Sequence, residues 1–395
     1  MRPRAVCCTI LSLCLLVLPG CWDMKDVDER AMVMAIGIDL AEDEGEEEGE
    51  KPMGAAEEPR YRMSVEVPVL HRLLVAGEAG GAGGEEHEKA AWVLTSTGTS
   101  PAAITSKYDT RIWRVPFYGQ AQVLVIGEEA ARRGLRDLLD YFHRHQDVNN
   151  SRLILLIAQG EALDVIEVAP EIEDLLGIYL HKLVALVATT GRVQFKTFAE
   201  AIMELYDTGN AVLPRVRPAE TETVVGGSAV IKNWRLVGWL GEMETFGSLC
   251  ARGRLRGGTL VVGSPASETG EVAVSVTSSS TRTRVFLDGD RLRFEMLIRK
   301  EVDLTERLGG RLFDAELLQE VEEMLEEEVR NHTSTAIRKL QDEFSVDALG
   351  FHHIVRKQLP DAWEQMAENW DDVHFPEAVF QIQTDVNIRR TGTFR

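Results

Sequence analysis

Hydrophobic and polar positions alternate most clearly near the end of the chain. Residues 380–388 place phenylalanine, isoleucine, threonine and valine side chains at even positions and polar or charged side chains at odd positions. A period of two is that of a strand with one buried face. The same alternation predicts a strand at 60–70, and the short apolar segment 31–39, bounded by charge, is typical of a buried strand.

A period near 3.6 predicts a long helix over 314–344, because apolar residues recur on one face and acids lie opposite. After Pro360, Trp363, Met366 and Trp370 share one face of a further helix. We also expect strands at 92–95, 122–126, 152–158, 228–232, 235–240, 272–276, 281–286 and 291–302, and helices at 102–110, 128–142, 172–189 and 198–206.

The order of these elements indicates an α+β or mixed α/β protein with mixed sheets flanked by helices. Strands alternate with helices in the first half of the chain, which favours a mixed layer. Prolines 214 and 218 indicate a linker, and the pattern becomes rich in strands from about residue 269. We therefore expect a signal segment at 1–20 and three domains: 21–212, a small middle domain at 213–268, and an α+β domain at 269–395.

Charge is concentrated rather than spread over the chain. The formal net charge is −21, and segments 42–50, 78–88 and 314–328 together hold nineteen acidic residues and no Lys or Arg. The glycine-rich acidic stretches 41–59 and 77–88 lack the apolar surface that a packed core needs, so we expect disordered loops there. A nearly balanced remainder offers no basic face for nucleic acid and no polybasic patch for anionic lipid.

The N-terminus supplies a different route to a membrane. Arg2 and Arg4 precede an apolar run at 5–18, which is too short for a comfortable transmembrane helix and fits the core of a signal peptide. Leu18-Pro19-Gly20-Cys21 resembles a bacterial lipobox, in which the cysteine is diacylated and becomes the mature N-terminus. An ordinary secretory signal and an uncleaved anchor are the alternatives. Cys250 is the one thiol left in the mature body, so no disulfide framework is expected.

Catalytic motifs of the common hydrolases and phosphate-binding loops are missing from the sequence. His143 and His145 point to different sides of a predicted helix, and the adjacent His352 and His353 are equally poor as a chelating pair. The acids at 322–328 are expected to form a solvated helix face. We therefore expect no catalytic residue, no cofactor and no metal. Trp363 and Trp370 either pack their helix on a sheet or form a partner interface.

Several stretches of the chain resemble one known family. Cys21-Trp22-Asp23 and Ala35-Ile36-Gly37-Ile38-Asp39 are similar to the start of Ger(x)C spore germination lipoproteins, the C subunits of nutrient germinant receptors. Asn369-Trp370 and Val386-Asn-Ile-Arg-Arg-Thr-Gly392 are similar to the family's closing motif. The resemblance covers essentially the whole mature chain, while Pro19 and the two acidic loops depart from the family pattern.

The resemblance implies a non-enzymatic three-domain lipoprotein on the outer face of the spore inner membrane. Its partners would be the integral membrane A and B subunits, and its function would be to support the response to nutrient germinants. Two other classes remain open at this stage. A solute-binding lipoprotein of a transport system would need a deep interdomain cleft, and a lipid-anchored wall hydrolase would need a carboxylate pair or a metal site.

Overall fold

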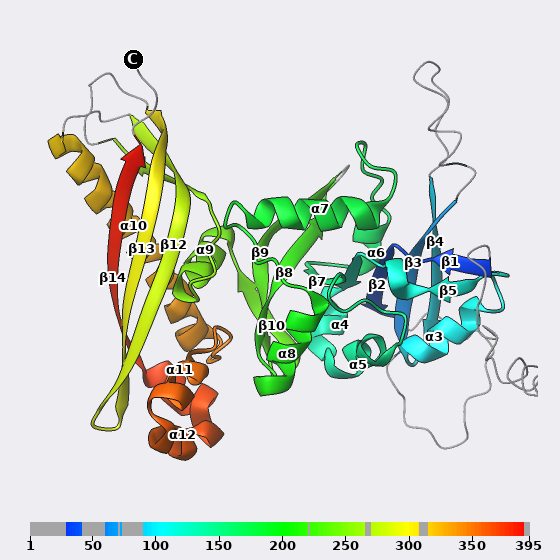
Figure 1. The fold of residues 1–395 in the computed structure, drawn as a ribbon. Helices are drawn as coiled ribbons and strands as arrows, with labels where there is room; N and C mark the ends of the chain where they lie inside the picture. The colour runs from blue at the N-terminus through cyan, green and yellow to red at the C-terminus, as the bar shows by residue number, and fades with distance from the viewer. Residues whose placement is uncertain are drawn as a thin grey trace, which may run out of the picture.

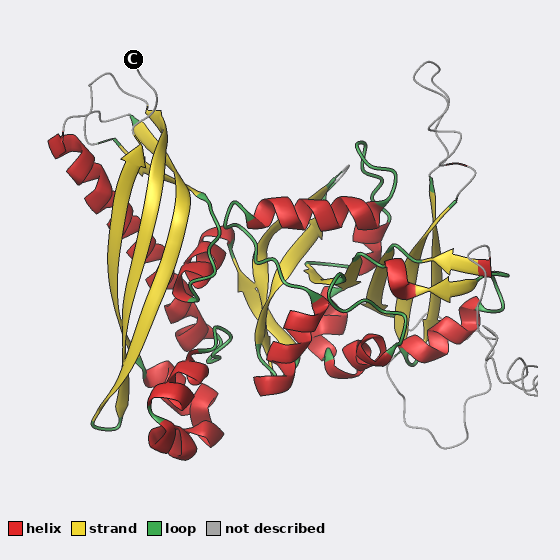
Figure 2. Cartoon of the chain, viewed as in Figure 1, coloured by secondary structure: helices red, strands yellow, loops and turns green. Residues whose placement is uncertain are grey.

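Two sheets, each covered by helices, form the two ends of the molecule (Figure 1). The computed structural model describes residues 29–41, 60–69, 72, 90–219, 222–264, 270–307 and 315–390. The predicted signal segment, Cys21 and nearly all of the two acidic loops lie outside these residues. Each of the two units contains both strands and helices (Figure 2), which confirms the expected α+β class.

The larger sheet has eight strands in the order β10-β9-β8-β7-β6-β2-β3-β4. Its central strands β2, β6, β7 and β8 run parallel, and antiparallel strands extend it on both sides. The bounds are β2 Ala35–Leu40, β3 Tyr61–Pro68, β4 Ala91–Gly98, β6 Val123–Ile126, β7 Ile154–Ala158, β8 Ala211–Pro218, β9 Thr223–Lys232 and β10 Arg235–Leu240. A separate parallel pair joins β1 Arg30–Met32 to β5 Val115–Phe117.

Helices cover both faces of this sheet, which explains why its innermost strands β6 and β7 are apolar throughout. One core cluster joins the sheet to α3 Pro101–Tyr108, α4 Glu128–Arg133, α5 Arg136–Arg144 and α8 Phe198–Thr208. The other joins the opposite face to α6 Ala162–Ile166 and α7 Leu176–Ala188. The β9–β10 hairpin turns at Asn233 and Trp234, whose φ angles of 49° and 64° match a two-residue hairpin turn.

The smaller sheet has four strands in the order β11-β12-β13-β14, and α10 lies along it (Figure 1). Helix α9 lies between the two units, and α11 to α13 gather at one end of the sheet. The bounds are β11 Thr259–Gly263, β12 Glu271–Asp288, β13 Arg291–Arg307, β14 Val379–Arg390, α9 Glu242–Ala251, α10 Ala315–Arg338, α11 Phe351–Gln358, α12 Pro360–Met366 and α13 Phe375–Glu377.

Strand β14 is an edge strand, and its outer edge is covered by α10. Glu322 accepts a hydrogen bond from the backbone N–H of Ile388 at 2.7 Å, and Glu326 accepts one from Val386 at 3.1 Å. These two carboxylates are half-buried, so this part of the acidic run differs from the expected solvated face. Unpaired edge N–H groups invite pairing with another chain, and the two glutamates satisfy them instead.

The structure divides one element expected from the sequence and joins two others. The helix expected at 128–142 is two helices, because Gly134 adopts a φ of 150° between α4 and α5. The strands expected at 272–276 and 281–286 are one continuous strand, β12. The boundary expected at residue 212 falls within β8, and β9 and β10 continue the larger sheet. The division into three domains stays a prediction.

Candidate functional site

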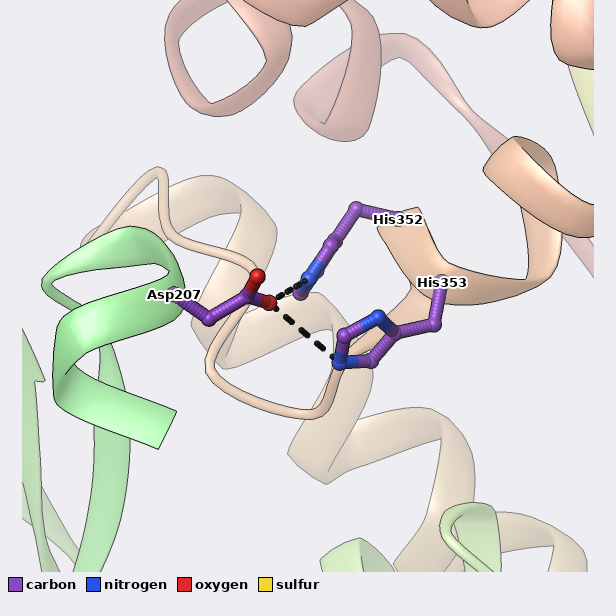
Figure 3. Close-up of side chains that lie close together, drawn as sticks. All are labelled: Asp207, His352 and His353. Atoms are coloured by element: carbon purple, nitrogen blue, oxygen red, sulfur yellow. Dashed lines mark hydrogen bonds and ion pairs between the residues drawn. The ribbon is translucent and has the colours of Figure 1, made fainter. Parts of the chain in front are cut away.

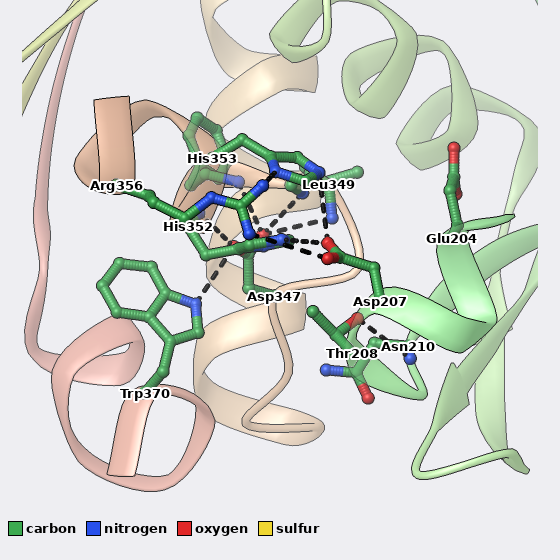
Figure 4. Close-up of polar contacts among 12 residues, drawn as sticks. Glu204, Asp207, Thr208, Asn210, Asp347, Leu349, His352, His353, Arg356 and Trp370 are labelled. Atoms are coloured by element: carbon green, nitrogen blue, oxygen red, sulfur yellow. Dashed lines mark hydrogen bonds and ion pairs between the residues drawn. The ribbon is translucent and has the colours of Figure 1, made fainter. Parts of the chain in front are cut away.

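The two units meet through polar groups around the last turn of α8. This helix begins with a capping box, in which Thr197 and Glu200 satisfy each other's backbone N–H groups. It ends at Gly209, whose φ of 80° is the left-handed conformation that glycine adopts without strain. Asp207 therefore lies at the helix end and faces α11 of the other unit (Figure 4).

Asp347 is the buried centre of this junction. Its side chain is fully buried and accepts hydrogen bonds from the first N–H groups of α11, which have no partner within the helix. The donors are Leu349, Gly350 and Phe351 to Oδ1, and the His352 backbone and Trp370 Nε1 to Oδ2, at 2.7–3.2 Å. Burial alone would raise the pKa of Asp347, but His352 and these backbone groups lower it. The carboxylate is thus a fixed anion.

His352 bridges the two units. Its Nδ1 lies 3.1 Å from Asp347 Oδ2, and its Nε2 lies 2.9 Å from Asp207 Oδ2. Burial would lower the pKa of His352, but the hydrogen bonds and charges of the two aspartates raise it. Burial alone would raise the pKa of Asp207, but the hydrogen bond and charge of His352 lower it below its usual value. The imidazole is therefore held between two carboxylates, one from each side of the junction.

His353 and Arg356 form the solvent-facing rim of the site. His353 Nε2 lies 3.4 Å from Asp207 Oδ2, and Arg356 donates to His353 Nδ1 at 3.1 Å. The rings of the two histidines are 4.0 Å apart. Burial and the neighbouring His352 lower the pKa of His353. Both rim side chains are half-exposed, so solvent reaches Asp207 from this side.

A second polar chain reinforces the same junction. Asp371 accepts from the backbone N–H of Asp347 at 2.7 Å and from Asn210 Nδ2 at 2.6 Å. Asn210 Oδ1 in turn accepts from the backbone of Asn233 at 3.0 Å. Burial raises the pKa of Asp371. The β9–β10 turn, the end of α8 and the C-terminal helices are thereby tied together.

The residues singled out from the sequence fall in different places. Trp370 is 4% exposed and contributes to the junction through Asp347, whereas Trp363 is half-buried beside it at 5.4 Å between ring centroids. Cys250 is buried, and burial raises the pKa of its thiol. His143 is exposed on α5. Cys21 lies outside the described residues, so its assignment as the lipidated residue stays a prediction.

Sequence reasoning missed the junction because its members are far apart in the chain. Asp207 and His352 are 145 positions apart. One local signal was available: Asp347 precedes the start of α11 by a few residues, where a carboxylate commonly caps a helix. Within the described residues, no serine or cysteine side chain is hydrogen-bonded to His352 or His353. Among these residues the junction thus shows no serine–histidine or cysteine–histidine pair of the kind that many hydrolases use.

Comparison with known proteins defines the class. Residues 23–218 match the family described as the spore germination protein N-terminal domain, and residues 226–392 match the spore germination B3/GerAC-like C-terminal family. Together these matches cover most of the chain. The protein belongs to the Ger(x)C family of spore germination proteins, the type that forms the C subunit of germinant receptors.

Individual relatives agree with this assignment over their full length. Spore germination protein YndF of Bacillus subtilis (strain 168) is 26% identical, over 98% of this chain and 96% of the relative. Spore germination protein B3 of the same organism is 21% identical, over 98% and 97% respectively. The crystal structure of the GerBC protein superposes with a TM-score of 0.58 at 17% identity, covering 93% of this chain and 100% of the other. Asp207 and His352 fall in different family matches, so the junction joins the two matched regions.

Proposed function

We propose that this chain is the lipid-anchored, non-catalytic C subunit of a nutrient germinant receptor. It is attached through Cys21 to the outer face of the spore inner membrane and assembles with integral membrane A and B subunits. The observation that carries the proposal is the match of both family regions along nearly the whole chain, preceded by an apolar segment that ends at Cys21.

Membrane attachment in this proposal depends on the lipid at Cys21. Among the described residues, every helix is too short or too polar to cross a bilayer. Two acyl chains anchor a protein stably where one gives only reversible binding, so a diacylated cysteine is sufficient. Trp22, next to Cys21, would lie at headgroup depth, where indole rings are favoured.

The surroundings of Asp347 support a structural role for this residue. Its buried carboxylate is saturated by helix N–H groups and by the tryptophan indole, which fixes structure rather than a reacting group. A surface hollow of about 820 Å³ is lined by side chains that include Tyr61, Arg133, Trp234 and Arg235. That hollow belongs to the larger sheet unit, and it is not the interdomain cleft that a solute-binding lipoprotein needs.

Trp363 remains the better candidate for a partner contact. Trp370 is committed to the core, whereas the half-buried Trp363 keeps part of its ring accessible beside it. Aromatic side chains are enriched where partners bind. A surface around Trp363 is therefore our proposal for contact with a membrane subunit.

The anchor is tested by Cys21→Ala with Cys14→Ala as the matched control, because Cys14 lies in the segment that is removed. We expect the wild type and Cys14→Ala to take up a fatty-acid probe and to sediment with membranes. Cys21→Ala should take up no label, and spores carrying it should respond poorly to nutrients. Wild-type protein that stays on the membrane without label would show that residues 5–18 act as an uncleaved anchor.

A further inference from the structure

Three potential metal ligands converge at the interface of the two units. Asp207 Oδ2, His352 Nε2 and His353 Nε2 belong to a group whose ligand atoms all lie within 4.8 Å of one another (Figure 3). The carboxylate oxygen is 2.9 Å from one ring nitrogen and 3.4 Å from the other. Tetrahedral zinc with bonds of about 2.0–2.2 Å separates its ligand atoms by about 3.3–3.6 Å. The 3.4 Å spacing lies within this range, and the 2.9 Å spacing is shorter, so the Asp207 carboxylate and the His352 ring must separate by about 0.4 Å to admit the ion.

The surrounding hydrogen bonds orient one ligand as metal sites require. Asp347 cannot donate, so His352 Nδ1 must carry the proton of their 3.1 Å contact. In the neutral ring, Nε2 then presents a lone pair to the Asp207 carboxylate, 2.9 Å away. Two acceptors at that distance require a cation between them, either a proton or a metal ion. Carboxylate–histidine–metal arrangements of this kind are the usual outer support of zinc sites.

We propose that Asp207, His352 and His353 bind a divalent transition-metal ion of the zinc type, with Asp347 as the positioning residue behind His352. Imidazole and carboxylate ligands together suit zinc and its neighbours in the transition series. Two histidines and one carboxylate leave a fourth position open to water on the exposed side. The proposal replaces the expectation that the adjacent histidines bind no metal, because Asp207 lies within reach of both.

Arg356 competes with the metal in this arrangement. It donates to His353 Nδ1, so the proton of a neutral His353 ring is on Nε2, where the ion must bind. Metal binding moves that proton to Nδ1, and Arg356 must then turn away. Its side chain is 52% exposed and free to do so. Removing Arg356 should therefore strengthen binding, which a merely structural role for the cluster does not predict.

The ion would join the two family regions directly. Asp207 belongs to the region at 23–218, and the two histidines belong to the region at 226–392. Bound metal would hold α8 against α11 and stabilise the junction by mass action. Bound metal would therefore restrict the motion of the two units relative to each other.

The test is zinc titration of the full chain purified in detergent, with ZnCl₂ as the probe and a chromogenic chelator as competitor. His353→Gln is the main variant because His353 is 52% exposed, so the fold should tolerate it. We expect affinity to fall at least tenfold in His353→Gln and Asp207→Asn, and to rise severalfold in Arg356→Ala. The matched control, His143→Gln on the exposed face of α5, should bind as the wild type does.

Zinc K-edge absorption of the loaded wild-type protein gives a second readout that does not depend on any variant folding. Scattering from two imidazoles and one carboxylate is the expected result. Equal affinity of the wild type and His353→Gln, or a spectrum without two imidazoles, overturns the proposal. Neither outcome bears on the lipid anchor at Cys21, so the two proposals fail independently.

Discussion

Helix α8 carries two carboxylates, three residues apart, that bind different kinds of partner. Glu204 receives Lys196 Nζ at 2.6 Å, Arg252 at 2.5 Å and Arg254 at 3.2 Å. Asp207 receives two histidines and, at 3.7 Å, Arg356. Both carboxylates connect the first family region to the second, since Arg252 and His352 both follow residue 226.

The Glu204 and Asp207 clusters differ in which of their side chains change charge near neutral pH. Burial alone would raise the pKa of Glu204, but Lys196 and Arg252 lower it to about 2. Burial lowers the pKa of Lys196 to about 8, which still leaves the ammonium charged at neutral pH. The Glu204 cluster is thus ionised at neutral pH. The Asp207 cluster depends on imidazoles, which gain or lose a proton near neutrality. One contact fixes the junction, and the other can respond to its surroundings.

Breaking the fixed contact should have the largest effect. Glu204→Gln leaves Lys196, whose side chain is 1% exposed, beside Arg252 without a compensating charge. Removing one partner of a buried pair costs about 3–5 kcal/mol. We expect a loss in that range in the free energy of unfolding, measured by urea denaturation at pH 7.

Glu128→Gln is the control for this change. Glu128 pairs with the exposed Arg132 in one turn of α4, and such surface pairs contribute at most about 1 kcal/mol. Equal losses in the two variants would show that the Glu204 cluster is no more than a surface contact.

The responsive contact should appear as a pH dependence. The pKa of His352 is raised in the folded protein, so its contribution is fully present below its unfolded value and is lost as pH rises through the folded value. Asp207→Asn removes one of the two carboxylates that raise it. The stability difference between the wild type and Asp207→Asn should therefore be largest near about pH 6 and shrink at higher pH.

Hydrogen bonds to charged groups are worth about 1.5–3 kcal/mol, so this difference should be smaller than the Glu204 effect. Denaturation should be measured with a chelator present and above about pH 5, since the lowered pKa values of Asp207 and Asp347 act only at more acidic pH. A difference that is constant from acid to alkaline pH would show that His352 does not change charge in this range.

Removing the outer arginine of each cluster should have the smallest effect on the free energy of unfolding. Arg254 and Arg356 are about half-exposed, at 51% and 52%, and each adds a peripheral charge to its carboxylate. Arg254→Ala and Arg356→Ala should each lower the free energy of unfolding by less than about 1 kcal/mol. A much larger loss in one variant alone would show that the two clusters differ through their outer arginines and not through the inner partners Lys196 and His352.

The sequence predicted secondary structure well where a single periodicity of apolar residues was clear. The alternation at 380–388 matches β14, in which the even positions are the less exposed ones. The strands expected at 272–276 and 281–286 are joined in β12, because pairing with β13 continues through Ser278, Ser279 and Ser280 after a register shift that follows Val276. Tertiary pairing overrides local composition at such positions.

The junction could not be predicted from local sequence patterns, because the fold brings together residues that are far apart in the chain. The chain passes through β8 to β10 and through β11 to β13 of the smaller sheet before His352 returns to the end of α8. The two histidines were judged as a pair on one helix, where their geometry is poor. Their common partner comes from another helix, and a single sequence carries no record of that contact.

The glutamates that cover the edge of β14 bear on how this protein is handled in the laboratory. Acidic surface helices are common targets for charge-reducing substitution when a protein resists crystallisation. Here Glu322 and Glu326 accept backbone hydrogen bonds, while Glu323 and Glu327 in the same run are exposed. Lysine at the first two positions would remove the acceptors of the Val386 and Ile388 N–H groups, and unsatisfied groups at a strand edge invite self-association. Surface engineering of α10 should therefore be confined to Glu323 and Glu327.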